Sequence, residues 1–347
     1  MNPLVGLLRF LLASSVIICH FWTSGAPGSG PVAVVGFFFI SGFLITYIRV
    51  ERYADIRQIP AFVANRALRI FPLYWAAIST ALLVALFLPI TQQGDYAIGI
   101  PRNASDVLTN IIVYGLYGPV KQILPQTWSL HPELIFYVVI GLGTAPNYWT
   151  TLVGFIGSLG ICLLYLVGAI AIPFYGDPLG NSVAFFAGSL TYHVRHTLVV
   201  GAIMFVAITV VYFCNHFVVP LWYKASDWNL ALSLIPLALI VATGWASKSN
   251  QAGKGRAASI CHFLGVCAYP LFLIHWVIGA ITMEILFSGQ RPYGPLFLLL
   301  AGPLSLLAAA AMAILVEGPL ENCRSSIRQR SINSQVLIVG IERQPIS

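Results

Sequence analysis

Uninterrupted apolar runs of more than 20 residues are the feature that most constrains how this chain folds. Residues 70–90 and 294–316 contain no charged side chain. A helix needs about 20 mainly apolar residues to cross a bilayer core about 30 Å thick, whereas a barrel strand needs about 10 residues of alternating polarity. Only 8% of the 347 residues are charged, against roughly 25% in soluble domains. We therefore predict an all-α, polytopic membrane protein.

The apolar pattern predicts about ten transmembrane helices. Residues 3–23 are interpreted as a retained first helix and not as a cleaved secretory signal, because Arg9 lies inside the apolar run and no small-x-small cleavage site follows. The predicted spans are 3–23, 32–48, 70–90, 127–145, 149–172, 180–194, 198–219, 228–246, 262–287 and 294–316.

These spans predict how the chain is divided. Residues 1–321 form an integral-membrane domain, and residues 322–347 form a basic cytoplasmic tail. The longest interval between spans, 91–126, leaves no room for a soluble domain of ordinary size. A functional site must therefore be built from the helices and their ends.

The distribution of basic residues predicts the orientation. With both termini in the cytoplasm, 13 of the 18 Lys and Arg residues fall in cytoplasmic segments, as the positive-inside rule requires. Removing the short sixth span would place the basic loop 247–260 and the Arg-rich tail outside, so the charge pattern favours ten spans. The formal net charge of +7 then reflects topology and attraction to anionic lipid or ligand at the inner face, and not nucleic-acid binding.

Two further residue types carry weaker predictions. The six cysteines show no CxxC pairing and lie mostly in apolar spans, where an isolated cysteine behaves as a small hydrophobic residue. We predict neither a disulfide framework nor a metal site. The glycines of the fifth span, Gly154, Gly157 and Gly160, are predicted to let neighbouring helices approach closely.

Ionisable residues inside apolar segments are costly, so each is a candidate for function, although a hydrogen-bonded structural role is the alternative. Arg9 and His20 are 11 positions apart in the first span. On a helix this spacing is about 20° from three full turns and about 16 Å along the axis. The two side chains therefore share one helix face, with Arg9 toward the cytoplasmic end and His20 toward the outer end.

Two more groups of charged residues accompany this pair. Arg66 and Arg69 lie three positions apart just before the third span. They are either an ordinary positive-inside flank or a phosphate clamp, since guanidinium groups bind phosphate oxygens in pairs. Glu133 enters the apolar fourth span and needs a partner there. The ten-span topology predicts that Glu133 lies at the depth of His20.

Six motifs follow one another along the chain: Arg9 with His20, VVGFFFISGFLIT at 34–46, NRALRIFPLYW at 65–75, TWSLHPELIFY at 127–137, AYPLFLIH at 268–275 and VEGPLE at 316–321. In this order they resemble the acyltransferase-3 family over residues 3–321. Members of that family are polytopic membrane proteins that O-acylate surface polysaccharides, lipid-linked sugars, nodulation factors and some macrolides. The resemblance implies an acyltransferase of the bacterial cytoplasmic (inner) membrane.

The resemblance also implies roles for individual residues. His20 looks like the essential histidine, Arg9 its partner, and Glu133 the acidic member of the Trp-Ser-Leu motif, in which Trp128 and Ser129 are expected to line the site. Arg66 and Arg69 are implied to bind the donor. Tyr269 and His275 are further candidate lining residues. Many members carry an Asp before the Phe-Phe-x-x-Ser-Gly run, where this chain has Val35 and Gly36.

The expected reaction moves an acyl group, acetyl by default from the resemblance, from cytoplasmic acyl-CoA to a hydroxyl of a saccharide or lipid-linked saccharide, with no metal. Arg66 and Arg69 would hold the nucleotide phosphates, with Lys254 and Arg256 adding to the field. His20 would act as general base or carry the acyl group, and Glu133 would orient it. A secondary transporter with an Arg/His/Glu proton relay and a non-catalytic family member are the alternatives.

Overall fold

The computed structural model describes residues 3–25, 29–88, 95–116, 120–170, 176–195, 255–290, 292 and 294–339. Every regular element within these ranges is a helix, which confirms the predicted fold class. Six helical stretches there are long and apolar enough to cross a membrane: Pro3–Phe21, Ser29–Arg52, Ile56–Phe87, Tyr148–Tyr165, Arg256–Phe287 and Leu296–Gln329.

Most predicted spans coincide with described helices, with shifted ends. These are α1 (Pro3–Phe21), α2 (Ser29–Arg52), α3 (Ile59–Phe87), α5 (Leu130–Val138) with the π-helical η4 (Val139–Thr144), α6 (Tyr148–Leu166), α7 (Pro178–Val194), α11 (Arg256–Phe287) and α12 (Leu296–Met312). The spans predicted at 198–219 and 228–246 lie outside the described residues. The total of ten spans and the orientation of the termini therefore stay predictions.

The third span differs most from its prediction of 70–90. Its helix, α3, already begins at Ile59, with Pro60 in the first turn, where the missing amide costs nothing. A short 3₁₀ turn, η1 (Ile56–Gln58), precedes it and starts with a capping box between Asp55 and Gln58. Charged residues end an apolar run but do not end a helix, so Arg66 and Arg69 lie within α3 and not at its mouth.

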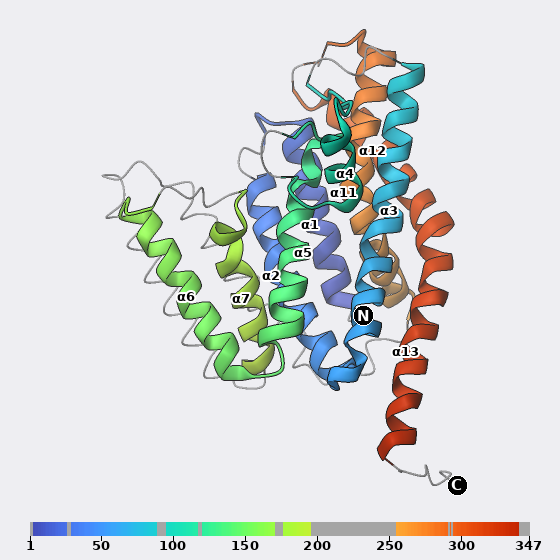
Figure 1. Cartoon of the computed structure of the whole chain (residues 1–347). Coiled ribbons are helices and arrows are strands. Elements are labelled where there is room, and N and C mark those ends of the chain that lie inside the picture. Colours follow the sequence, from blue (N-terminus) through green and yellow to red (C-terminus); the bar gives the residue numbers. More distant parts are fainter. Residues whose placement is uncertain are drawn as a thin grey trace.

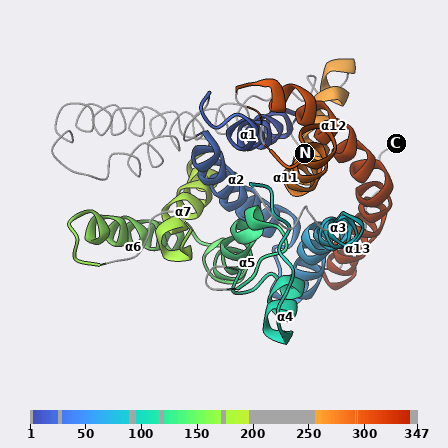
Figure 2. The same ribbon diagram turned by 90° about the horizontal axis from the view of Figure 1, so that it is seen from above.

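Helices α1 and α11 lie against each other, with α2 beside α1 and with α3 and α12 beside α11 (Figure 2). Helix α2 packs on α1, α7 on α2, and α6 on α7 at one edge, while α3 and the C-terminal α13 (Gly318–Val339) lie toward the opposite edge (Figure 1). Helices α12 and α13 are joined by a π-helical turn, η6 (Ala313–Glu317). Short elements, α4 (Ala104–Ile112) and the 3₁₀ η3 (Pro125–Ser129), lie between α3 and α5.

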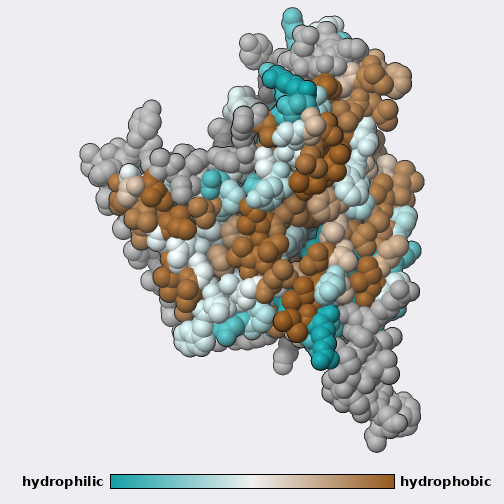
Figure 3. Space-filling view, viewed as in Figure 1, coloured by the Kyte–Doolittle hydropathy of each residue, from teal (hydrophilic) through white to brown (hydrophobic). Residues whose placement is uncertain are grey.

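The outward faces of the long helices are apolar, as contact with lipid requires. Brown, hydrophobic side chains cover much of the face seen in Figure 3. Strongly exposed examples are Leu86 and Phe87 on α3, Val153 on α6 and Leu307 on α12. A soluble protein does not expose apolar surface on this scale, so the surface supports the same conclusion as the sequence.

Helices α2 and α7 touch backbone to backbone through two glycines. A Cβ added at Gly42 would lie 1.9 Å from the carbonyl oxygen of Phe185, and one at Gly188 would lie 1.9 Å from that of Phe39. Thr46 and Ser189 share a hydrogen bond of 2.7 Å beside this contact. Small residues allow such close packing in membranes.

The prediction for the fifth span is confirmed only at one of its three glycines. A Cβ at Gly154 would meet the Phe186 ring at 2.3 Å, but Gly157 and Gly160 have no heavy atom within 4 Å of that position. Gly154 therefore faces a side chain of the neighbouring helix, whereas Gly42 of α2 and Gly188 of α7 each face the backbone of a neighbouring helix.

We expect Gly42→Ala to lower the unfolding midpoint of the protein in detergent, at a cost of about 1–3 kcal/mol, because the new methyl group overlaps the α7 backbone. The matched control is Gly157→Ala, which has open space and gains helix propensity, so its midpoint should stay equal or rise. Equal midpoints for the two variants would contradict the close α2–α7 contact.

Candidate active site

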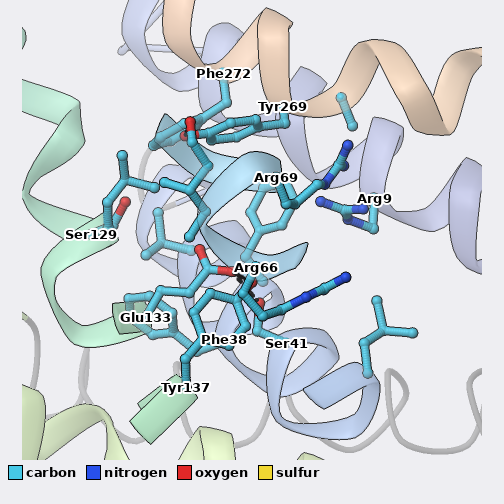
Figure 4. Close-up of a pocket in the computed structure, with 16 residues that line it drawn as sticks. Arg9, Phe38, Ser41, Arg66, Arg69, Ser129, Glu133, Tyr137, Tyr269 and Phe272 are labelled. Carbon is cyan, nitrogen blue, oxygen red and sulfur yellow. Dashed lines mark hydrogen bonds between the residues drawn. The ribbon is translucent and has the colours of Figure 1, made fainter. Parts of the chain in front are cut away.

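Five helices contribute to a pocket that collects most of the predicted site residues. Arg9 comes from α1, Arg66 and Arg69 from α3, Glu133 from α5 and Tyr269 from α11. The pocket, called here the site pocket, has a volume of about 70 Å³. Figure 4 shows the three arginine side chains on one side of it and Ser129, Glu133 and Tyr137 on the other. Its apolar wall includes Val34, Phe37, Phe38, Leu44, Ile70, Leu130 and Phe272.

The carboxylate of Glu133 is bound by two hydroxyl groups. Ser41 of α2 donates to Glu133 Oε1 at 3.1 Å, and Tyr137, one turn further along α5, donates to the same oxygen at 2.7 Å. Arg9 lies within electrostatic reach of Glu133 and of Arg69. The carboxylate thus provides negative charge beside a group of arginines.

The prediction that Glu133 lies at the depth of His20 is wrong, whereas its predicted role in orienting His20 stays a prediction. Glu133 shares the site pocket with Arg9, which is about 16 Å from His20 along α1. The 3₁₀ element η3 carries the chain into the bundle before α5 begins, so Glu133 enters at a deeper level than the apolar pattern suggests. The same element brings Ser129 to the pocket wall, and Trp128 packs edge-on against Phe38.

A second, wider cavity of about 410 Å³ adjoins the site pocket and shares Arg9, Arg66, Arg69 and Leu44 with it. We call it the basic vestibule. Six of its lining residues are arginines and two are glutamates: Arg9, Arg52, Arg66, Arg69, Arg324, Arg328, Glu317 and Glu321. The excess of positive charge favours an anionic ligand.

Glu317 is the centre of the ion pairs in the vestibule. It is almost completely buried, and its Oε1 accepts hydrogen bonds from Arg69 and, at 2.6 Å, from Arg324. The π-helical turn η6 ends at Glu317. Such a turn inserts one extra residue into a helix and changes the direction of the side chains around it, and here the carboxylate faces α3.

His20 is in the last turn of α1. It lines neither the site pocket nor the basic vestibule, so it is separate from the arginines of both cavities. Its Nδ1 is 2.9 Å from Nε2 of His275, a completely buried residue of α11. The two imidazole planes are inclined by 21° with centroids 5.2 Å apart, so the rings meet edge to edge through this contact. His275 was predicted to line the site, and the structure makes it the direct partner of His20.

Aromatic side chains connect the histidine pair to the site pocket. Phe272, one turn before His275 on α11, lines the pocket and contacts the His275 ring with centroids 6.3 Å apart. Phe37 packs on Phe272 from α2. Along α11, Tyr269, Phe272 and His275 therefore lead from the arginines to His20.

A family model described as an acyltransferase domain matches residues 4–316. The chain belongs to the acyltransferase-3 family. The resemblance seen in the motifs is thereby confirmed over nearly the whole chain.

One curated relative of this acyltransferase-3 chain is the exopolysaccharide production protein ExoZ of Rhizobium meliloti (strain 1021). It is 32% identical over 139 residues, which cover 38% of this chain and 38% of ExoZ. The chain thus aligns with well under two thirds of that relative's length. No solved structure matches the chain.

Several residues of this acyltransferase-3 site were not predicted from the sequence. Glu317, Ser41 and Tyr137 all lie in quoted motifs, but no role was assigned to them because their partners are distant in sequence. Arg324, which lies in the predicted tail, lines the vestibule. Arg256, expected to add to the phosphate field, does not line the vestibule, and Lys254 lies outside the described residues.

We expect Glu317→Gln to destabilise this acyltransferase-3 protein by about 3 kcal/mol or more, because it leaves Arg69 buried without a compensating charge. Thermal unfolding in detergent measures the loss. The control is Glu321→Gln, which removes a carboxylate that is 45% exposed and pairs with Arg324 and Arg328; an exposed pair contributes about 1 kcal/mol or less. Equal losses would show that Glu317 is not the structural centre of the vestibule.

Proposed function

We propose that this protein is a membrane O-acyltransferase that transfers an acyl group, acetyl by default, from cytoplasmic acyl-CoA to a hydroxyl of an exopolysaccharide or its lipid-linked precursor at the outer side of the bacterial cytoplasmic membrane. The observation that carries the proposal is the pair of joined cavities. A vestibule lined by six arginines narrows into the site pocket, from which aromatic residues lead to His20.

The vestibule supports an anionic donor with several phosphate groups. Arginine binds phosphate oxygens in pairs through its planar guanidinium group. Arg66 lines both cavities, and its Nη2 donates a hydrogen bond to Asn65 Oδ1 at 2.9 Å. Six arginines against two glutamates leave enough positive charge for the 3′-phosphate and the diphosphate of coenzyme A.

The length of the donor supports the position of His20. An extended pantetheine arm is about 15–20 Å long from its bond count, comparable to the rise of about 16 Å between Arg9 and His20 on α1. With its phosphates at Arg66, acyl-CoA would present its thioester near His20. Glu133 and its two hydroxyl partners would balance the charge of the arginines that the arm passes.

The chemistry follows one of two routes. In direct transfer, His20 takes the proton of the acceptor hydroxyl, the oxygen attacks the thioester carbonyl, the C–S bond breaks, and the thiolate leaves with the proton from His20. In the two-step route, an imidazole nitrogen of His20 attacks the thioester carbonyl, the C–S bond breaks, and coenzyme A leaves as the thiolate from an acyl-imidazolium. The acceptor hydroxyl then attacks the acyl carbonyl, the C–N bond breaks, and the hydroxyl proton passes to the thiolate. ExoZ, named for exopolysaccharide production, supports a saccharide acceptor.

The first test measures transfer of label from acyl-labelled coenzyme A to a membrane glycan fraction by the purified, lipid-reconstituted protein. We expect His20→Ala to lower the rate by about 10²-fold or more, the usual contribution of a general base. The control Thr282→Val removes a buried hydroxyl of α11 and should leave transfer unchanged. Label transfer that survives in His20→Ala would contradict the role of His20; gradient-driven solute uptake without transfer would favour the transporter alternative.

The second test separates donor from acceptor binding. Arg66→Gln should raise the KM for acyl-CoA about tenfold or more, the value of a lost charge-assisted hydrogen bond, and change the KM for the acceptor much less. Steady-state kinetics with each substrate varied in turn measure both values. Arg102→Gln, an exposed arginine just before α4, is the matched control and should change neither. Equal increases in both KM values for Arg66→Gln would argue against a phosphate site.

A further inference from the structure

His275 is a completely buried histidine whose two ring nitrogens both have partners. We propose that His275 is a positioning residue that keeps the proton of neutral His20 on Nδ1, so that Nε2 is the nitrogen that reacts. The proposal rests on the proposed function, because it requires His20 to act as base or nucleophile.

The hydrogen-bond partners of His275 determine its tautomer. Its Nδ1 lies 3.2 Å from the carbonyl oxygen of Leu271, one turn earlier on α11. A carbonyl oxygen only accepts hydrogen bonds, so His275 must carry its proton on Nδ1. In the opposite tautomer, the lone pair of His275 Nδ1 would face a lone pair of the Leu271 carbonyl oxygen. The two atoms would then repel each other, and this buried hydrogen bond would be lost.

The tautomer of His275 in turn determines that of His20. Neutral His275 with its proton on Nδ1 has a lone pair on Nε2, which lies 2.9 Å from Nδ1 of His20. His20 must therefore donate from Nδ1. Because this holds for both the neutral ring and the imidazolium, the proton that His20 gains and releases during a reaction is the one on Nε2.

Hydrogen bonds of the surrounding residues hold the two imidazole rings in this relative position. Tyr96 donates to the backbone carbonyl of His20 at 2.6 Å, and Trp276 donates to that of Ala97 at 3.2 Å. One short segment is therefore bonded to both histidine-bearing helices. The Trp276 ring stands edge-on to His20, with an interplanar angle of 86°.

Glycine brings the helices close enough for the contact. Gly279 is one turn after His275 on α11, and a Cβ there would lie 3.0 Å from the rings of Phe21 and Tyr96. Phe21, directly after His20, also packs against the His275 ring with centroids 5.9 Å apart. A larger residue at 279 would push α1 and α11 apart at the level of the histidine pair.

A fixed tautomer matters for both chemical routes. General-base catalysis needs the lone pair on the nitrogen that faces the acceptor hydroxyl, and acyl-imidazole formation needs it on the nitrogen that faces the thioester. If the proton could move to Nε2, part of the protein would be inactive at any moment. A second residue that holds a catalytic histidine in one tautomer is a recognised requirement in triads.

The kinetic test compares substitutions that keep or remove the acceptor at position 275. His275→Leu removes it, and we expect kcat to fall about tenfold or more, the value of one hydrogen bond, while the KM for acyl-CoA stays within about twofold. His275→Gln carries a carbonyl oxygen near the former Nε2 and should recover most of the rate. Thr282→Val, on the same helix, is the control for a buried polar substitution.

A merely structural His275 gives a different result. It would make His275→Gln and His275→Leu equally slow in proportion to their loss of thermal stability, and this outcome would overturn the proposal. If His275→Leu does not fold, His275→Asn replaces it, because its shorter amide does not reach the position of Nε2.

The second readout does not depend on catalysis. Solid-state ¹⁵N–¹³C spectra of the lipid-reconstituted protein with ring-labelled histidine distinguish the two tautomers, and the chain has only seven histidines. Signals are assigned by their loss in His20→Ala and His275→Gln. We expect both residues to carry the proton on Nδ1; a proton on Nε2 of neutral His20 would overturn the inference. Activity retained in His20→Ala alongside the expected spectra would instead contradict the proposed function alone.

Discussion

The structure depends on the cost of leaving a charge unpaired inside a medium of low dielectric. Arg69 is largely buried within α3, and it is tolerated there because Glu317 accepts its hydrogen bond. The same carboxylate binds Arg324, so one residue joins α3, the π-helical turn η6 and α13. Arg69, Glu317 and Arg324 all line the vestibule. Since one carboxylate cannot neutralise every arginine that lines it, the cavity keeps a positive charge that a ligand can use.

Sequence reasoning identified the arginines of the site because charge is scarce in this chain. With only 8% charged residues, Arg9, Arg66 and Arg69 stand out from their apolar surroundings, and they do line one pocket. The depth of Glu133 was not accessible in the same way. An apolar pattern gives the order of helices and which face is polar, but the offset between helices depends on how η3 enters the bundle, which no periodicity encodes.

Contacts between segments that are distant in the sequence could not be predicted from it either. Glycines were visible in three helices, yet only packing shows that Gly42 and Gly188 face a neighbouring backbone while Gly157 faces open space. The pairing of His20 with His275 joins residues 255 positions apart. The family resemblance suggested an acidic residue near position 35, where this chain has valine and glycine. In this protein the buried polar partner of His20 comes from α11.

The two cavities differ in size and chemistry in a way that separates binding from reaction. The vestibule has a volume of about 410 Å³ and is lined by arginines, whereas the site pocket has about 70 Å³ and a largely apolar wall. Under the proposed function, the phosphates stay at the arginines of the vestibule while the slender thioester arm continues past Phe272. Beyond it, the histidines are enclosed by aromatic rings. The complete burial of His275 strengthens its hydrogen bond with His20.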